Sequence, residues 1–168
     1  MPQSEYTLPN VRLTLPNALL LGEAKQFVRQ GPDYHVTLRT KGNSMLPFIR
    51  GEIDSVDLSI PEVPYAKGDI VLAEVEPDHY ILHRIWEIRG EKVILMGDGN
   101  CRGKEKCRYE NLIAKVNYIV LPDESKVDPN TKWARFLASL WRILLPLRPY
   151  LLSIRWHWLG FKERVRGK

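Results

Sequence analysis

The pattern of apolar and polar residues changes twice along this chain. Residues 16–30 repeat apolar side chains at intervals of three and four, which is typical of an amphipathic helix. Asn17 lies near the expected N-cap, and Gly31 with Pro32 ends the helix. The apolar face of this helix comprises Leu20, Ala24, Phe27 and Val28.

Residues 34–40 then alternate with a period of two and are rich in Val, Thr and Leu, a pattern that predicts a half-buried strand. From residue 41 to 121, short β-type runs follow one another between turn signals. These runs are residues 55–59, 69–75, 79–88, 92–96 and 114–121. Strands roughly ten residues apart, with no helical stretch between them, favour a mostly-β folded sheet or barrel over a parallel α/β domain.

The pattern becomes helical again after residue 128. Residues 133–145 and 150–165 both read as helices, and Pro146 and Pro149 separate them, so we expect a helical pair joined by a proline elbow. The sequence therefore divides into an N-terminal arm with a helix at 1–32, a β body at 33–121 and a helical extension at 122–168.

Charge is distributed unevenly over these parts. The 168 residues carry a net charge of +5, but residues 131–168 hold nine Lys or Arg and a single acid, whereas residues 1–130 have a net charge of −3. The extension also holds four tryptophans, and its basic residues recur at 135, 142, 148, 155 and 162. Such a segment either contacts an anionic membrane surface or packs on the β body with its arginines in solvent. A nucleic-acid-reading domain is not expected, because the body is slightly acidic.

The sequence indicates a cytoplasmic protein, peripheral at a membrane if the extension binds lipid. The first residues lack a basic start and an apolar core, and no apolar run reaches about 18 residues. Cys101 and Cys107 lie six residues apart in a polar loop and are interpreted as free thiols. Four histidines without zinc-type spacing do not predict a metal site. No Walker or dinucleotide-binding fingerprint occurs in the sequence, so no cofactor is expected.

The stretch KGNSMLPFI at residues 41–49 is the most informative one for chemistry. Ser44 at a tight turn, with Asn43 before it and Met45 anchored in the core after it, could present a hydroxyl together with backbone N–H groups. These are the parts of a nucleophile with an oxyanion hole. On its own, the same stretch is also consistent with a simple turn between two strands.

Four further short motifs follow the motif of Ser44 along the chain. We call the five motifs boxes, and they are residues 44–47 (SMLP), 68–71 (GDIV), 82–85 (LHRI), 97–100 (GDGN) and 113–116 (IAKV). Together they resemble the signal peptidase I family, which shares its peptidase fold with the LexA-type self-cleaving repressors of the DNA-damage response. The resemblance covers roughly residues 36–120, with Ala114 in place of the glycine of the closing box. It implies a signal-peptidase-like folded β-barrel body.

The resemblance also implies roles for single residues. Ser44 would be the nucleophile and His83 the general base, as in the Ser/His branch of the family. A third, acidic member would be either Asp98 or Glu105, and both stay open because Lys104 stands where relatives place a second aspartate. Asp98 could instead hold its turn through backbone hydrogen bonds. His83 alone could instead be a hydrogen-bonded strand histidine. We interpret its neighbour Arg84 as a solvated or salt-bridged strand residue and not as a catalytic one.

The resemblance thus predicts a serine endopeptidase that cuts an extended leader or precursor peptide after small residues. The N-terminal transmembrane helix of ordinary signal peptidases is not seen, so secretory precursors are poor candidates for the substrate. Self-cleavage is less favoured, because no helix-turn-helix pattern precedes the body and no Ala-Gly or Cys-Gly bond precedes Ser44 in a linker. The alternative from a different class is a catalytically inactive peptide-binding or membrane-associated module on the same fold.

Overall fold

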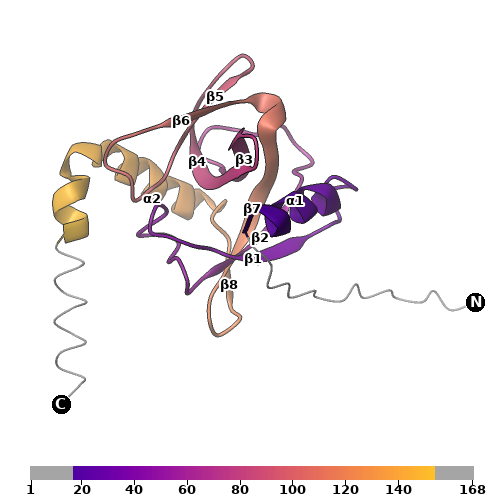
Figure 1. The fold of residues 1–168 in the computed structure, drawn as a ribbon. Coiled ribbons are helices and arrows are strands. Elements are labelled where there is room, and N and C mark those ends of the chain that lie inside the picture. Colours follow the sequence, from indigo (N-terminus) through magenta and orange to yellow (C-terminus); the bar gives the residue numbers. More distant parts are fainter. Residues whose placement is uncertain (1–16, 154–168) are drawn as a thin grey trace, which may run out of the picture.

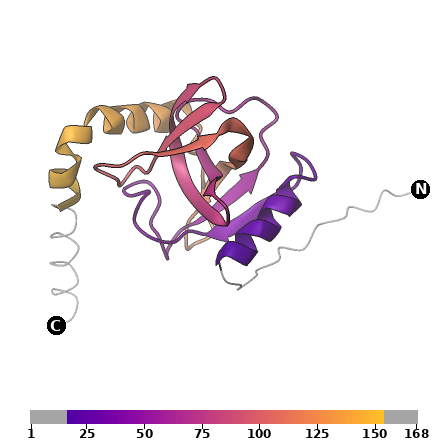
Figure 2. The ribbon, with the colours of Figure 1, turned by 45° about the horizontal axis from the view of Figure 1, so that its top comes forward.

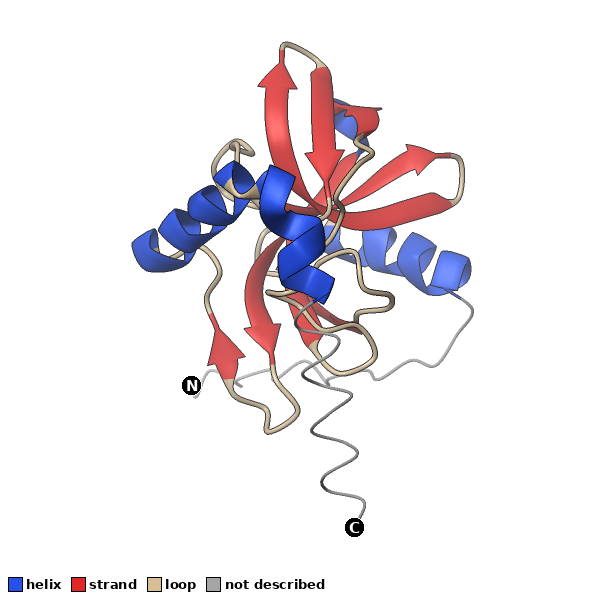
Figure 3. Cartoon of the chain, turned by 90° about the vertical axis from the view of Figure 1, so that its left-hand side faces the viewer, coloured by secondary structure: helices blue, strands red, loops and turns tan. Residues whose placement is uncertain are grey.

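The structure, a computed structural model, describes residues 17–153. Most of its regular structure is one antiparallel sheet, which confirms the mostly-β class (Figure 3). In chain order the elements are α1 (Asn17–Val28), β1 (Val36–Arg39), β2 (Ser55–Ser59), β3 (Ile70–Glu76), β4 (His79–Arg89), β5 (Lys92–Met96), β6 (Glu105–Arg108), the 3₁₀ turn η1 (Tyr109–Asn111), β7 (Leu112–Val120), β8 (Lys126–Val127), α2 (Lys132–Ile143) and the 3₁₀ turn η2 (Leu145–Leu147).

The strands are ordered β1-β2-β7-β3-β4-β5-β6, and β8 pairs with β7. Consecutive strands from β3 to β6 form hairpins, whereas β7 returns to lie between β2 and β3. The register shifts within several pairs, for example between Asp57 and Leu58 on β2, and such bulges increase the bending of a sheet. The sheet therefore curls around its own interior (Figure 1).

Strand β3 lies at the centre of the body and is buried on both faces. Ile70 and Leu72 point into one apolar cluster with residues of α1, β2 and β7, while Val71 and Ala73 point into a second cluster with residues of β4 and β5. All four side chains are at most 3% exposed. Because successive strand residues face opposite sides, a continuous apolar run fits only a strand covered on both sides.

The helices lie on opposite sides of the β body (Figures 1 and 2). Ala24 and Val28 of α1 are buried in the first apolar cluster, and Lys25 of α1 forms an ion pair with Glu74 of β3. Helix α2 begins after Thr131, whose side-chain oxygen accepts a hydrogen bond from Ala134 N at 3.2 Å. None of the helices within residues 17–153 combines the length and the apolarity needed to cross a bilayer.

Most elements expected from the sequence are present, and two strands were not predicted. β6 is a short edge strand with the sequence EKCR, and β8 is only two residues long, so neither shows an apolar alternation. β8 also lies beyond residue 121, in the segment assigned to the extension. The proline elbow takes the form of η2, after which residues 148–153 are helical again. The rest of the second expected helix, residues 154–165, lies outside the described residues.

Candidate active site

Ser44 lies in the loop between β1 and β2, which is held closed from both ends. Thr40 N donates to Asp54 O at 3.1 Å and joins the two ends of the loop. Inside it, the Met45 carbonyl accepts hydrogen bonds from Phe48 N at 3.1 Å and Ile49 N at 3.0 Å, and the Met45 side chain is buried. Ser44 itself is half-buried, whereas its neighbour Met45 anchors the loop in the core.

His83 lies in β4 opposite Val71 of β3, and only 5% of it is exposed. Its Nδ1 atom is 3.0 Å from Oε2 of Glu105, the first residue of β6. An ionised carboxylate can only accept, so the proton of this contact is on Nδ1. The lone pair of the neutral imidazole is then on Nε2, the nitrogen that a general base uses.

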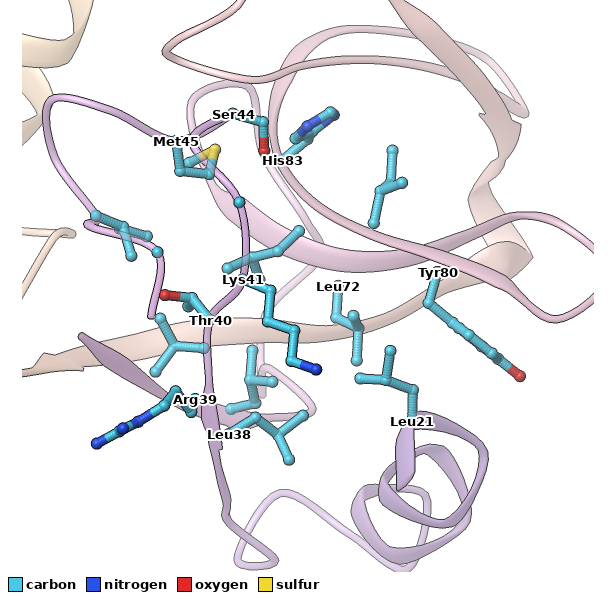
Figure 4. Close-up of a pocket in the computed structure, with 17 residues that line it drawn as sticks. Leu21, Leu38, Arg39, Thr40, Lys41, Ser44, Met45, Leu72, Tyr80 and His83 are labelled. Carbon is cyan, nitrogen blue, oxygen red and sulfur yellow. The ribbon is translucent and has the colours of Figure 1, made fainter. Parts of the chain in front are cut away.

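Ser44 and His83 line the same cavity of about 220 Å³. Figure 4 shows the two side chains at the same end of the cavity and Leu21 of α1 near the other end. The described residues that line it include the cations Arg39 and Lys41, and none of them is an acid. The other lining residues are largely apolar, and they include Leu38, Met45, Ile49, Val56, Leu58 and Leu72. A cavity of this kind can accept an apolar side chain beside Ser44 and His83.

The turn after β5, residues 97–100, lies against both Ser44 and His83. Gly99 N donates to Ser44 O at 2.7 Å, and a Cβ atom placed on Gly97 would lie 2.3 Å from Ser44 O and 2.9 Å from His83 Nε2. Real Cβ atoms do not approach other atoms so closely. Gly97 therefore allows the backbone of residues 97–100 to touch the loop of the serine and the ring of the histidine at once.

Asp98 and Glu105, the two candidates for the acidic partner of His83, have different partners in the structure. Glu105 contacts His83, whereas the Asp98 carboxylate accepts from Arg84 Nε at 3.0 and 3.1 Å and from Arg84 Nη2 at 2.7 Å. Arg84 also donates to Gly68 O at 2.8 Å. It therefore links Gly68 of the second box to Asp98 of the fourth box, and of its two expected states it is the salt-bridged one. The structure thus brings Glu105 to the histidine and gives Asp98 a structural partner. Lys104 lies over the ring of Trp86.

Burial lowers the pKa of His83 below its ordinary value of 6.5, and this effect outweighs the negative charges of Glu105 and Asp98, which act to raise it. The imidazole is therefore neutral at pH 7. A neutral, buried imidazole with a carboxylate on Nδ1 can take a proton from a hydroxyl and return it to a leaving group.

The other residues singled out in the sequence have structural positions. Asn43 is exposed, and its carbonyl accepts from Leu46 N at 3.2 Å. His35 and His79 are exposed and absent from the cavity lining. Cys101 and Cys107 are free thiols, and burial raises the pKa of Cys107 to about 11. Within residues 17–153, no group of three or more His, Cys, Asp or Glu could hold a metal ion.

Three residues that contact this site were not among the site residues expected from the sequence. One is Gly97 as a contact point, although its box was recognised. The others are Trp141 and Arg148 of the extension, which donate hydrogen bonds to the turn at residues 97–100. Their helical spacing of seven was the available signal, but it did not indicate which part of the body they contact.

Comparison with models of known protein families and with curated proteins returned no match for this chain.

Proposed function

We propose that this protein is a serine endopeptidase of the signal peptidase type, with Ser44 as nucleophile, His83 as general base and Glu105 as the residue that orients the base. One observation carries the proposal: the His83 ring is held by Glu105 on Nδ1 and lies with Ser44 on a single cavity. Triads are recognised by this geometry and not by sequence position.

The arrangement of the five boxes supports a signal-peptidase- or LexA-like body. The SMLP box is in the loop after β1, GDIV leads into β3, LHRI is in β4, GDGN follows β5 and IAKV is in β7. The Arg84 contacts with Asp98 and Gly68 and the Gly99 contact with Ser44 then join four of these boxes to one another. Such convergence is expected if the boxes serve one site.

The proposed reaction is peptide hydrolysis through an acyl-enzyme. Nε2 of His83 takes the hydroxyl proton as Ser44 Oγ attacks the scissile carbonyl, and the oxyanion is stabilised by backbone N–H groups of the loop at residues 43–45. The imidazolium then gives this proton to the leaving amine, and the C–N bond breaks. Water, deprotonated by the same histidine, attacks the ester and regenerates Ser44.

The proposed substrate is an extended segment of a leader or precursor peptide. β1 is an edge strand whose last residue leads into the loop of Ser44, and an extended peptide can pair with such an edge. The apolar cavity would take a substrate side chain, and Arg39 and Lys41 at its border favour peptides with an acidic residue near the scissile bond.

The test is mass spectrometry of a diverse peptide pool incubated with the purified protein. We expect cleavage that falls at least about 10³-fold in both Ser44→Ala and His83→Ala, with melting temperatures close to that of the original chain. Ser125→Ala, an exposed serine in the turn before β8, is the matched control and should keep full activity. Cleavage that persists in Ser44→Ala, or peptide binding without turnover, would reject the proposal and favour a binding module.

A further inference from the structure

Helix α2 and the turn after it present their apolar side chains to solvent. Ile143 is 73% exposed, Tyr150 is 70% exposed and Trp133 is 68% exposed, which are unusual values for large apolar residues in a helix that packs on a body. The exposed residues of this surface, which we name the outer apolar face, are Trp133, Phe136, Leu140, Ile143, Leu147, Tyr150 and Leu151.

Three arginines of the same segment point inward. Arg135 binds Asp69, which is 1% exposed, at 2.7 Å, and Arg142 lies over the ring of Trp86 at 3.9 Å. Arg148 is 2% exposed and donates to Asn100 O at 2.7 Å. The described part of the basic stripe therefore attaches the segment to the β body. An expectation that these three arginines meet lipid head groups does not fit their contacts.

The position and the composition of the outer apolar face indicate its occupant. It follows α2 and the elbow as an arm beside the β body (Figure 2). Aromatic residues are prominent on it, and the chain beyond residue 153 continues with Trp156, Trp158 and five Lys or Arg against one acid. Aromatic and aliphatic side chains combined with cations are typical of segments that lie in the interface of an anionic bilayer.

A second copy of the chain is a poorer occupant. Two-fold association would place the same segment against itself, and residues 131–168 carry an excess of eight positive charges. We propose that the outer apolar face docks on an anionic lipid surface. This proposal is independent of the peptidase activity.

The experiment is co-sedimentation of the full chain with vesicles of phosphatidylcholine alone and of phosphatidylcholine with roughly a third phosphatidylglycerol. We expect binding to the anionic vesicles that falls at least tenfold in Phe136→Glu/Ile143→Glu. Val63→Glu changes an equally exposed apolar residue outside the outer apolar face and should alter binding less than twofold. Circular dichroism checks that each variant is folded.

Three results would overturn the proposal. One is failure of the original chain to bind anionic vesicles, and another is equal binding to both vesicle types. The third is a dimer in lipid-free solution that Phe136→Glu/Ile143→Glu converts to a monomer, which would assign the outer apolar face to a second copy.

A second, independent observation concerns the inner side of the same segment. Trp141 Nε1 donates to Asp98 O at 2.7 Å, and Arg148 Nη1 donates to Asn100 O at 2.7 Å. These carbonyls belong to the turn whose glycines touch Ser44 and His83. Arg148 also donates to the Trp141 backbone carbonyl at 3.2 Å, and its guanidinium lies 5.4 Å from the centroid of the Trp141 ring, so the two side chains contact each other.

We infer that Trp141 and Arg148 are positioning residues for the catalytic turn, an inference that rests on the proposed function. The measurement is the rate at which a fluorophosphonate probe labels Ser44, followed against pH. Trp141→Phe keeps an aromatic ring next to Phe48 and removes the N–H donor. We expect labelling to slow at least tenfold in Trp141→Phe and Arg148→Ala, with an altered pH profile and partial rescue of Arg148→Ala by added guanidinium.

Different results would contradict the proposed function and the positioning role of Trp141 and Arg148. Absence of labelling at Ser44 in the original chain would overturn the proposed function and this inference with it. Normal labelling of the original chain together with unchanged rates and pH profiles in folded Trp141→Phe and Arg148→Ala would overturn only the positioning role.

Discussion

The carboxylate of Glu105 lies 3.0 Å from Nδ1 of His83, although the two residues are 22 positions apart in the chain. The β5–β6 hairpin creates this contact, because Leu95 of β5 pairs with Glu105 and β5 also pairs with β4, the strand of His83. A short edge strand thus brings an acid to the face of the sheet where the histidine lies.

Replacing each acid separately should distinguish its role. Glu105→Gln removes the charge that holds the His83 ring, and turnover should fall about 10³-fold with little change in melting temperature. Asp98→Asn leaves the largely buried Arg84 without its carboxylate partner, so the free energy of unfolding should drop by about 3 kcal/mol. Peptide cleavage and thermal melting of both variants test this. A stable, inactive Asp98→Asn beside an active Glu105→Gln would reverse the assignment.

The pH dependence of turnover should reflect the lowered pKa of His83. The base works only when neutral, so activity should be complete above the pKa and fall as the pH drops through it. The acidic limb of kcat/KM should therefore have its midpoint below 6.5. Glu105→Gln removes a negative charge that raises this pKa, and the midpoint should move lower still. A midpoint above 7 in the original chain would contradict the assignment of His83.

Gly97→Ala should damage the site directly. The added Cβ would meet the Ser44 carbonyl and Nε2 of His83, and the carbonyl belongs to a backbone held by Gly99 N. We expect a loss of turnover of about 100-fold or more and a loss of about 1 to 3 kcal/mol in stability. Gly22→Ala in α1 is the control, because its Cβ would have only an ordinary contact with Tyr80, at 4.0 Å. Full activity of Gly97→Ala would show that the turn at residues 97–100 is remote from the chemistry.

Lys41 should influence which peptides are cleaved. It lines the cavity (Figure 4), and its charge would attract an acidic residue near the scissile bond. Lys41→Glu should lower kcat/KM for acidic peptides about tenfold relative to neutral ones, and high salt should reduce the difference. Lys92→Glu makes the same charge change on β5, away from the cavity lining, and should leave the ratio unchanged. If both variants change this ratio equally, the effect comes from the net charge of the protein and not from the position of Lys41.

The sequence by itself determined the elements whose signals are local. The helical spacing of Ala24 and Val28, the continuous apolar run in β3 and the turn residues between strands predict a mostly-β body behind a short helix, because each pattern depends on neighbours a few residues apart. β6 carried no such signal, since an exposed edge strand gains its pairing from β5 and not from its own apolar residues.

Only the tertiary structure decided which acid meets His83 and which side of α2 faces the body. Asp98 and Glu105 are both compatible with the chain order, but Arg84 pairs with the first and the β5–β6 hairpin delivers the second. An amphipathic helix has the same periodicity whichever face is inward. The orientation of α2 depends on Asp69, Trp86 and the carbonyls after β5, which attract its arginines and leave its apolar face in solvent. These groups come from distant parts of the chain, so no pattern of neighbouring residues predicts their contacts with α2.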